Sequence, residues 1–211
     1  MSAQAPFWLR PLINAVGTVE AADLSRFTPP ADGSGRHSAV LILLAGADLE
    51  TADVLLLQRA ATLRSHAGQV AFPGGATDPE DASSTATALR EAEEEVGLKP
   101  DTVDVLAELP ALYLPPSGFV VTPVLAYWQD PHDVGVVDAA EVAGVRRVRI
   151  TDLADPSNRF IVKHPSGFVG PGFAADGLFV WGFTAGLLDR LLRLAGWEHP
   201  WNRDKVRPLP D

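Results

Sequence analysis

The sequence predicts a single mixed α/β domain, and three observations support that fold class. The chain has 211 residues, which is near the upper end for one compact domain. Short apolar runs bounded by turn residues recur along it, as is typical of buried strands. Two segments have the signals of helices, one beginning at Ser83 or Ser84 and ending at Gly97, the other at about 183–195. Strands with helices between them favour a mixed α/β architecture.

The expected strands follow one another in chain order. The runs Val40–Leu44 and Val54–Leu57 are joined by a loop at 46–53, and residues 58–81 are mostly loop with a short strand at Val70–Phe72. Segments that alternate as strands do follow the first helix: Val103–Glu108, Tyr113–Leu114, Phe119–Trp128, Glu141–Ile150 and Phe160–Lys163. Gly177–Trp181 leads into the second helix.

The two ends of the chain differ from its middle. Residues 1–36 mix helical and loop signals and end in the breaker cluster Thr28–Gly35, so we expect an N-terminal arm. The main domain is expected at 37–196, and the tail 197–211 has no readable periodicity. The N-terminus lacks the basic and apolar regions of a signal peptide, so a cytoplasmic protein is expected.

Charge and composition restrict the partners. Seventeen Lys and Arg against 27 Asp and Glu leave a net charge of −10, the wrong sign for a general nucleic-acid or membrane-surface binder. The longest apolar run, Ala39–Ala47, is about half of a membrane span. The absence of cysteine excludes disulfides, thiolate zinc sites and a cysteine nucleophile. A small phosphorylated ligand remains possible, because it responds to the charges near its binding site and not to the net charge of the protein.

The segment Ala88–Leu98 is the most informative part of the chain. At about 100° per residue, three glutamates share one helix face: Glu91, Glu94 and Glu95. The apolar side chains face inward on another side: Leu89, Ala92 and Val96. Glu93 points away from the cluster and is expected to be exposed, and Arg90 is spaced to pair with Glu94.

A solvated face is the ordinary interpretation of a glutamate-rich helix, but two features oppose it here. Carboxylates at these spacings repel one another unless a cation lies between them. They also crowd the C-terminal half of the helix, where the helix dipole disfavours negative charge. Oxygen-only clusters suit hard divalent ions, so the sequence predicts a site for Mg²⁺ or Mn²⁺.

Gly74-Gly75 followed by Arg90-Glu-Ala-Glu-Glu-Glu-Val-Gly-Leu98 resembles the box of the Nudix hydrolase family, whose core is Arg-Glu-apolar-X-Glu-Glu-X-Gly-apolar. The spacing departs from the family upstream, with one residue more between Gly75 and Arg90 than the general pattern has. The first acidic residue of the box therefore falls on Asp81, counted from Gly75, or on Ala82, counted back from Arg90.

Residues before and after the box resemble the coenzyme A pyrophosphatase subgroup. The upstream match is Leu56-Leu-Gln-Arg59, Arg64, Gly68 and Phe72-Pro-Gly-Gly75. The downstream match is Pro116-Ser-Gly-Phe119, Val121-Thr-Pro123, Trp181-Gly and Thr184-Ala-Gly186. The resemblance runs from about residue 37 to 195.

The resemblance implies a Nudix α/β/α sandwich with a mixed central sheet, and a box that forms loop–helix–loop. It implies that Glu91 and Glu95 hold the Mg²⁺ or Mn²⁺ ion, that Glu94 adds to the metal shell or orients water, and that Arg90 holds the cluster in register. The implied substrate-binding residues are Arg59, Arg64, Phe72, Gly74 and Gly75. The implied reaction is hydrolysis of the pyrophosphate of coenzyme A or an acyl-coenzyme A.

Several alternatives stay open at this point. The substrate could be another nucleoside diphosphate derivative such as ADP-ribose or NADH, or the chain could be a Nudix-fold binding module without turnover. The general base could be Glu94, Glu141 or another residue, and Glu141 could instead complete the metal site or be an ordinary surface residue. His66 could line the site or have no role, and a solvated strand edge is the favoured interpretation of three arginines: Arg146, Arg147 and Arg149. The oligomeric state is undetermined.

Overall fold

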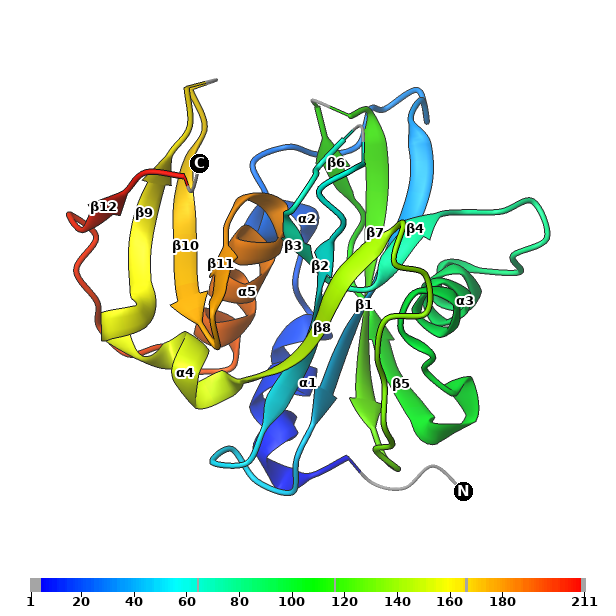
Figure 1. Cartoon of the computed structure of the whole chain (residues 1–211), viewed down its shortest axis with the longest axis horizontal. Coiled ribbons are helices and arrows are strands. Elements are labelled where there is room, and N and C mark those ends of the chain that lie inside the picture. The colour runs from blue at the N-terminus through cyan, green and yellow to red at the C-terminus, as the bar shows by residue number, and fades with distance from the viewer. Residues whose placement is uncertain (1–4, 64, 116, 166, 210–211) are drawn as a thin grey trace.

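The computed structural model describes residues 5–63, 65–115, 117–165 and 167–209. Two β-sheets and the helices around them make up the fold, and Figure 1 shows helix α5 between the two sheets. This arrangement confirms the predicted mixed α/β class and the sandwich that the resemblance implies.

The larger sheet has the strand order β3-β2-β1-β7-β5, with β4 added to β1, β6 to β7 and β8 to β2. Strands β1 and β7 pair in parallel and the other pairs are antiparallel, so the sheet is mixed. Its strands are β1 (Arg36–Ala45), β2 (Asp53–Arg59), β3 (Val70–Ala71), β4 (Gly74–Ala76), β5 (Val103–Glu108), β6 (Leu112–Leu114), β7 (Phe119–Trp128) and β8 (Val142–Arg149).

The smaller sheet has the order β11-β10-β9-β12. Its strands are β9 (Arg159–Lys163), β10 (Val169–Ala175), β11 (Leu178–Val180) and β12 (Val206–Arg207). The α-helices are α1 (Arg10–Val16), α2 (Ala21–Leu24), α3 (Ser84–Val96), α4 (Ile150–Ala154) and α5 (Gly182–Leu194). Short 3₁₀ turns cover Phe7–Leu9, Pro100–Thr102 and Pro156–Asn158.

Strand β1 is buried on both faces, which explains its continuous apolar sequence. Alternate residues such as Leu41 and Leu43 pack beneath α3, in a cluster with Ala88, Ala92 and Val96. The intervening residues pack on the other face against α1 and α5, for example Ile42 and Leu44. The sheet is therefore the middle layer, with α3 on one side and α1 and α5 on the other (Figure 1).

Helix α3 begins and ends where its sequence predicts. The Ser83 hydroxyl accepts a hydrogen bond from the Ala86 amide and caps the N-terminus. Gly97 ends the helix in the left-handed conformation, with φ at 72°. This helix carries the glutamate cluster, so its two caps define where the cluster lies against the sheet.

Strands β4, β10 and β12 are not expected from the sequence. Residues 58–81 were expected to be loop apart from 70–72, yet Gly74–Ala76 form β4 against β1. Strand β10 was also not expected, because its glycines and its proline at 171 lower strand propensity, and only pairing with β9 and β11 makes it a strand.

The ends of the described chain pack on the body of the protein. Trp8 donates a hydrogen bond to the Gly46 carbonyl at 3.0 Å and lies against Trp197, with 5.3 Å between ring centroids. The unpatterned tail supplies β12, which pairs with β9. Across the described residues, no helix has the length and apolar character to cross a membrane. The boundaries at 36/37 and 196/197 remain predictions.

Candidate active site

The three glutamates of α3 differ in their exposure to solvent. Glu95 is 5% exposed, because it lies next to the apolar face of the helix. The Glu91 side chain is 18% exposed and that of Glu94 is 60% exposed. Glu93 is exposed on another side, as predicted. The helix face that the three glutamates share therefore extends from the protein interior at Glu95 to solvent at Glu94.

The turn at Gly74-Gly75 lies directly against the glutamates. The Gly74 amide donates a hydrogen bond to Glu95 Oε2 at 2.9 Å. A Cβ atom on Gly75 would lie 2.4 Å from the Glu91 carboxylate, and one on Gly74 would lie 2.3 Å from the Ala39 carbonyl oxygen. Gly74 excludes a side chain because its Cβ would meet the backbone of β1, whereas a side chain at Gly75 would displace the Glu91 carboxylate.

Arg90 is the centre of a hydrogen-bonded network. Its Nη1 donates to Glu91 Oε1 and to Glu94 Oε2, both at 3.0 Å. Its Nη2 donates to the Ala76 carbonyl at 3.1 Å, and Nε and Nη2 donate to the two oxygens of Asp81 at 3.0 and 2.9 Å. Arg90 thus ties two members of the glutamate cluster to the loop before the helix.

The contact with Arg90 decides between the two positions that the spacing left open. Asp81 makes the bidentate contact, so the extra residue of this chain lies between Asp81 and Arg90. The Thr87 hydroxyl, which is fully buried, donates to Asp81 Oδ2 at 2.9 Å. Thr87 is not among the site residues predicted from the sequence, and its position one helical turn before Glu91 is the signal that could have identified it.

The charges on this network affect the pKa values of its members. The hydrogen bond from Arg90 is the main cause that holds the pKa of Asp81 well below its usual range. Burial raises the pKa of Glu91, and the hydrogen bond from Arg90 opposes that increase. Asp81 and Arg90 are therefore both charged at neutral pH and form a salt bridge.

Burial raises the pKa of Glu95 from 4.5 to about 7, and the Gly74 amide opposes the increase. The negative charges of Glu91 and Glu141 raise it further, whereas the positive charge of Arg59 lowers it. Two groups distant in sequence, Arg59 and Glu141, therefore act electrostatically on the same buried carboxylate.

Arg59 ends β2 on the side of the sheet where Glu95 lies. Within the described residues its guanidinium forms no salt bridge, and its Nε is buried without a hydrogen-bond partner. A cation in this state is available to an anionic ligand. Arg64, the second predicted phosphate contact, lies outside the described residues.

Phe72 is placed differently from the other predicted substrate residues. Its side chain is 2% exposed and packs in the core with Val70 and Val180. The ring anchors the turn that presents Gly74 and Gly75 and does not line an open surface.

The donor atoms of this cluster fit a hard divalent cation. Glu91 and Glu95 supply only oxygen ligands, and both have raised pKa values from burial. Among the described residues, no group of three or more histidine or acidic side chains is arranged to hold a metal ion by itself. Mg²⁺ can be bound through only one or two carboxylates, with water and substrate phosphate completing its shell.

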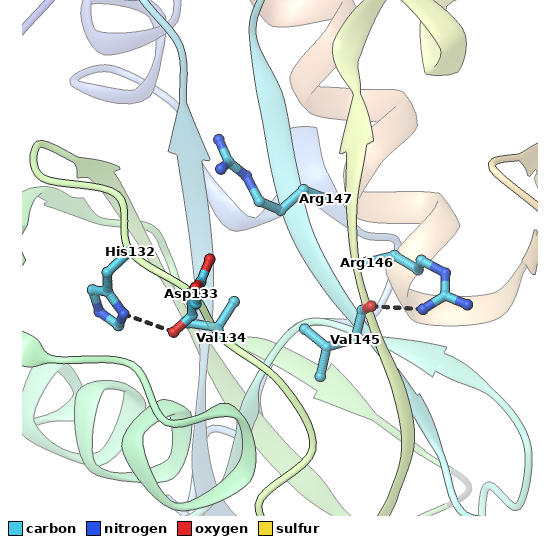
Figure 2. Close-up of a pocket in the computed structure, with 6 residues that line it drawn as sticks. All are labelled: His132, Asp133, Val134, Val145, Arg146 and Arg147. Carbon is cyan, nitrogen blue, oxygen red and sulfur yellow. Dashed lines mark hydrogen bonds between the residues drawn. The ribbon is translucent and has the colours of Figure 1, made fainter.

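The arginines of β8 lie away from this cluster. Arg147 pairs with Asp53 at 2.7 Å, and its strand position is opposite Leu55, toward the far end of β2 from Arg59. Figure 2 shows the pocket beside it, lined by His132, Asp133, Val134, Val145, Arg146 and Arg147, with Arg146 directed away from His132. The arginines are exposed on one strand, which supports the interpretation as a solvated strand edge.

The order of strands, the glycine turn and the glutamate helix together form an α/β sandwich with a carboxylate cluster at the contact between β4 and α3. A family model described as NUDIX domain matches residues 35–169. The chain therefore belongs to the Nudix family, as the residues of its box predict. Nudix hydrolases generally use divalent metal ions.

Similar proteins in curated collections carry the name uncharacterized Nudix hydrolase NudL. The protein from Cronobacter sakazakii is 41% identical over 153 residues, which cover 65% of this chain and 72% of the relative. The protein from Yersinia enterocolitica is 38% identical over 177 residues, 80% of this chain and 89% of the relative. A solved Nudix hydrolase from M. smegmatis, RenU, has a TM-score of 0.51 at 22% identity, covers 81% of this chain and 96% of that one, and agrees in fold.

Proposed function

We propose that this chain hydrolyses the pyrophosphate linkage of coenzyme A or an acyl-coenzyme A, with Mg²⁺ or Mn²⁺ as cofactor. The products would be 3′,5′-ADP and 4′-phosphopantetheine or its acylated form. The observation that carries the proposal is the cation Arg59, which lies beside the buried Glu95 without an acidic partner of its own among the described residues. It belongs to the segment Leu56–Gly75, whose residues resemble the coenzyme A subgroup.

In this proposal Glu91 and Glu95 hold the divalent ion. When bound, that ion would offset the charge on the pyrophosphate oxygens and make the phosphorus more electrophilic. Arg90 keeps Glu91 in place through the contacts that it shares with Asp81. Arg59 and Arg64 donate hydrogen bonds to phosphate oxygens, for which a planar guanidinium is suited. Gly74 and Gly75 leave room for a phosphate to approach the backbone.

Glu94 and Glu141 are the two carboxylates proposed to orient the attacking water. Both are exposed, so either can receive a proton and release it to solvent. Glu94 is held by Arg90 at 3.0 Å, whereas Glu141 acts on Glu91 and Glu95 from the segment before β8. To distinguish them, each is replaced by Gln and kcat is measured as a function of pH. The general base is the residue whose replacement removes the decrease of kcat at low pH.

The proposal is tested by incubating the protein with coenzyme A, acetyl-coenzyme A, ADP-ribose and NADH, each with Mg²⁺ or Mn²⁺, and identifying products by mass. We expect 3′,5′-ADP from the coenzyme A substrates. Glu95→Gln should abolish turnover, and Glu93→Gln on the exposed side of the same helix should retain it. Preference for ADP-ribose or NADH would contradict the coenzyme A assignment.

A further inference from the structure

The connection between β7 and β8, residues 129–141, runs along the end of α3. The Gly135 amide donates to the Val96 carbonyl at 3.0 Å, and the Val137 amide donates to the Glu95 carbonyl at 3.3 Å. The last carbonyls of a helix have no acceptor role inside it and need partners from outside. The connection supplies these partners, so it is fixed beside the backbone of a predicted metal ligand.

Asp138 accepts hydrogen bonds from three successive backbone amides of this connection. Its Oδ1 accepts from the Ala140 amide at 2.8 Å, and its carbonyl accepts from the amides of Glu141 at 3.1 Å and Val142 at 2.9 Å. An aspartate that bonds the amide two positions further along closes a tight turn. This turn begins directly after Val137 and directs the chain from the end of α3 to the start of β8.

The backbone of Glu141 is held on both sides, whereas its carboxylate is not held. The Ala60 amide, next to Arg59 in the chain, donates to the Glu141 carbonyl at 2.8 Å. Within the described part of the chain, the Glu141 carboxylate has no hydrogen bond and no salt bridge. It still acts electrostatically on Glu91 and Glu95. The place of this carboxylate therefore depends on the backbone that carries it.

We propose that Asp138 is a positioning residue, which holds the turn so that the Glu141 carboxylate can accept the proton of the attacking water. The inference rests on the proposed function, in which Glu141 is one of two carboxylates near the pyrophosphate. A proton on the other, Glu94, would oppose its 3.0 Å ion pair with Arg90. Glu141 has no such pair among the described residues, so it can take the proton without losing a partner.

In the proposed step, the water oxygen bonds to one phosphorus atom as Glu141 takes its proton. The bond from that phosphorus to the bridging oxygen breaks, and the electron pair stays on the leaving phosphate. Glu141 is exposed and then releases the proton to solvent. A carboxylate displaced from the water would slow this step and leave substrate binding almost unchanged.

The role requires an acceptor atom at position 138 and not a negative charge. Asp138→Asn keeps the acceptor and removes the charge, whereas Asp138→Glu keeps the charge on a longer side chain that cannot close the same turn. Asp138→Ala removes both. Asp133→Ala is the matched control, because Asp133 lies on the same connection (Figure 2) and its exposed carboxylate has no hydrogen bond among the described residues.

The test measures kcat and KM of these variants for coenzyme A with Mg²⁺. We expect Asp138→Ala and Asp138→Glu to lower kcat about 2- to 10-fold, the effect of one lost hydrogen bond, with little change in KM. Asp138→Asn and Asp133→Ala should stay near wild type. Hydrogen exchange followed by mass spectrometry should be faster at residues 140–142 in Asp138→Ala and unchanged in Asp138→Asn. If Asp138→Ala does not fold, Asp138→Glu gives the same comparison.

A double variant tests whether the two residues act together. Glu141→Gln alone should lower kcat about 10²- to 10⁴-fold, as expected for a lost general base. Adding Asp138→Ala to Glu141→Gln should then cause no further loss, because the turn would have no carboxylate left to position.

Three results overturn the inference while the proposed function stands. They are an unchanged kcat in Asp138→Ala, an equal loss in Asp138→Asn and Asp138→Ala, and a loss in the Glu141→Gln background as large as in wild type. A wild-type protein that hydrolyses ADP-ribose or NADH in place of coenzyme A contradicts the substrate assignment alone, and the same comparison is then made with that substrate. A wild-type protein that hydrolyses none of these compounds overturns both.

Discussion

Glu95 carries a carboxylate into the interface between α3 and β4, where the Gly74 amide donates to it. Burial is the largest cause of the raised pKa of Glu95, and the nearby negative charges of Glu91 and Glu141 raise it further. The folded protein without metal thus binds a proton on Glu95 that the unfolded chain releases at lower pH. This residue links stability to both pH and metal.

The first prediction concerns stability against pH in the absence of metal. The pKa of Glu95 is 4.5 in the unfolded chain and about 7 in the folded protein. The protonated carboxyl therefore contributes fully to the free energy of unfolding below pH 4.5, and this contribution is lost as pH rises through 7. The loss is roughly 3 kcal/mol at full ionisation. Urea denaturation at a series of pH values, with chelator present, should show stability falling over this window in wild type.

Glu95→Gln is the control for that experiment, since the glutamine side chain has nearly the shape of glutamate and does not titrate. It should be more stable than wild type at pH 8 without metal and should show a smaller gain on adding Mn²⁺. A wild-type profile that is flat between pH 5 and 8, or a Mn²⁺ gain equal in both proteins, would contradict the role given to Glu95.

A second prediction at this scale concerns Thr87. Its hydroxyl donates to Asp81, and Asp81 in turn holds Arg90 against Glu91. Thr87→Val should lower stability by about 1 kcal/mol through the lost hydrogen bond. If Thr87 is a positioning residue, the variant should also require more Mn²⁺ for half-maximal activity, and Thr87→Ser should restore it. Lower stability with unchanged metal dependence would indicate a structural role alone.

At the scale of elements, the site depends on how closely β4 approaches α3. Strand β4 was not expected from its sequence Gly-Gly-Ala, and pairing with Ser38–Val40 of β1 creates it. The pairing brings the Gly74 amide to Glu95 and leaves Gly75 against Glu91. The glycine turn and the glutamate helix therefore form one unit, although their separate sequences suggest a turn and a helix.

The third prediction follows from that contact. Gly75→Ala places a methyl group within 2.5 Å of the Glu91 carboxylate oxygens, so Glu91 must move. We expect little loss of stability, because the end of a flexible side chain can shift, and a large loss of activity, because the Glu91 carboxylate leaves its position. Gly17→Ala is the matched control, since its Cβ would meet ordinary contacts at 3.5 Å or more. Activity retained in Gly75→Ala would contradict a fixed position for Glu91.

At the scale of the whole molecule, a buried ion network joins the smaller sheet to α5 and the tail. Arg159 on β9 is fully buried and contacts Asp189 of α5, and its Nη1 donates to Glu198 at 3.0 Å. Trp201 covers the guanidinium, with 4.5 Å from its Cζ to the ring centroid. The tail therefore encloses a charge that β9 alone could not bury.

The fourth prediction tests this network. Asp189→Asn removes one partner of a buried charge, which typically costs about 3–5 kcal/mol. Urea denaturation should show that loss, whereas Asp101→Asn at an exposed position should have little effect. A loss below about 1 kcal/mol would show that Glu198 alone compensates Arg159.

The sequence by itself determined the class of fold, the limits of α3 and the face that its glutamates share. These depend on local rules: cap residues, apolar periodicity and the angle between successive helical residues, all of which act within a few positions. The resemblance of the box to the Nudix family is equally local, and the family match confirms it. The exposure of Glu93 and the burial of Ala92 and Val96 were predictable for the same reason.

Only the tertiary structure decided which glutamate is buried, that Asp81 and not Ala82 meets Arg90, and that Glu141 and Arg59 act on Glu95. It also decided that the Phe72 ring belongs to the core and that residues 169–175 form a strand. Each of these depends on contacts between segments far apart in the chain. Their energies come from burial, close approach and pairing across the sheet, which no local pattern encodes.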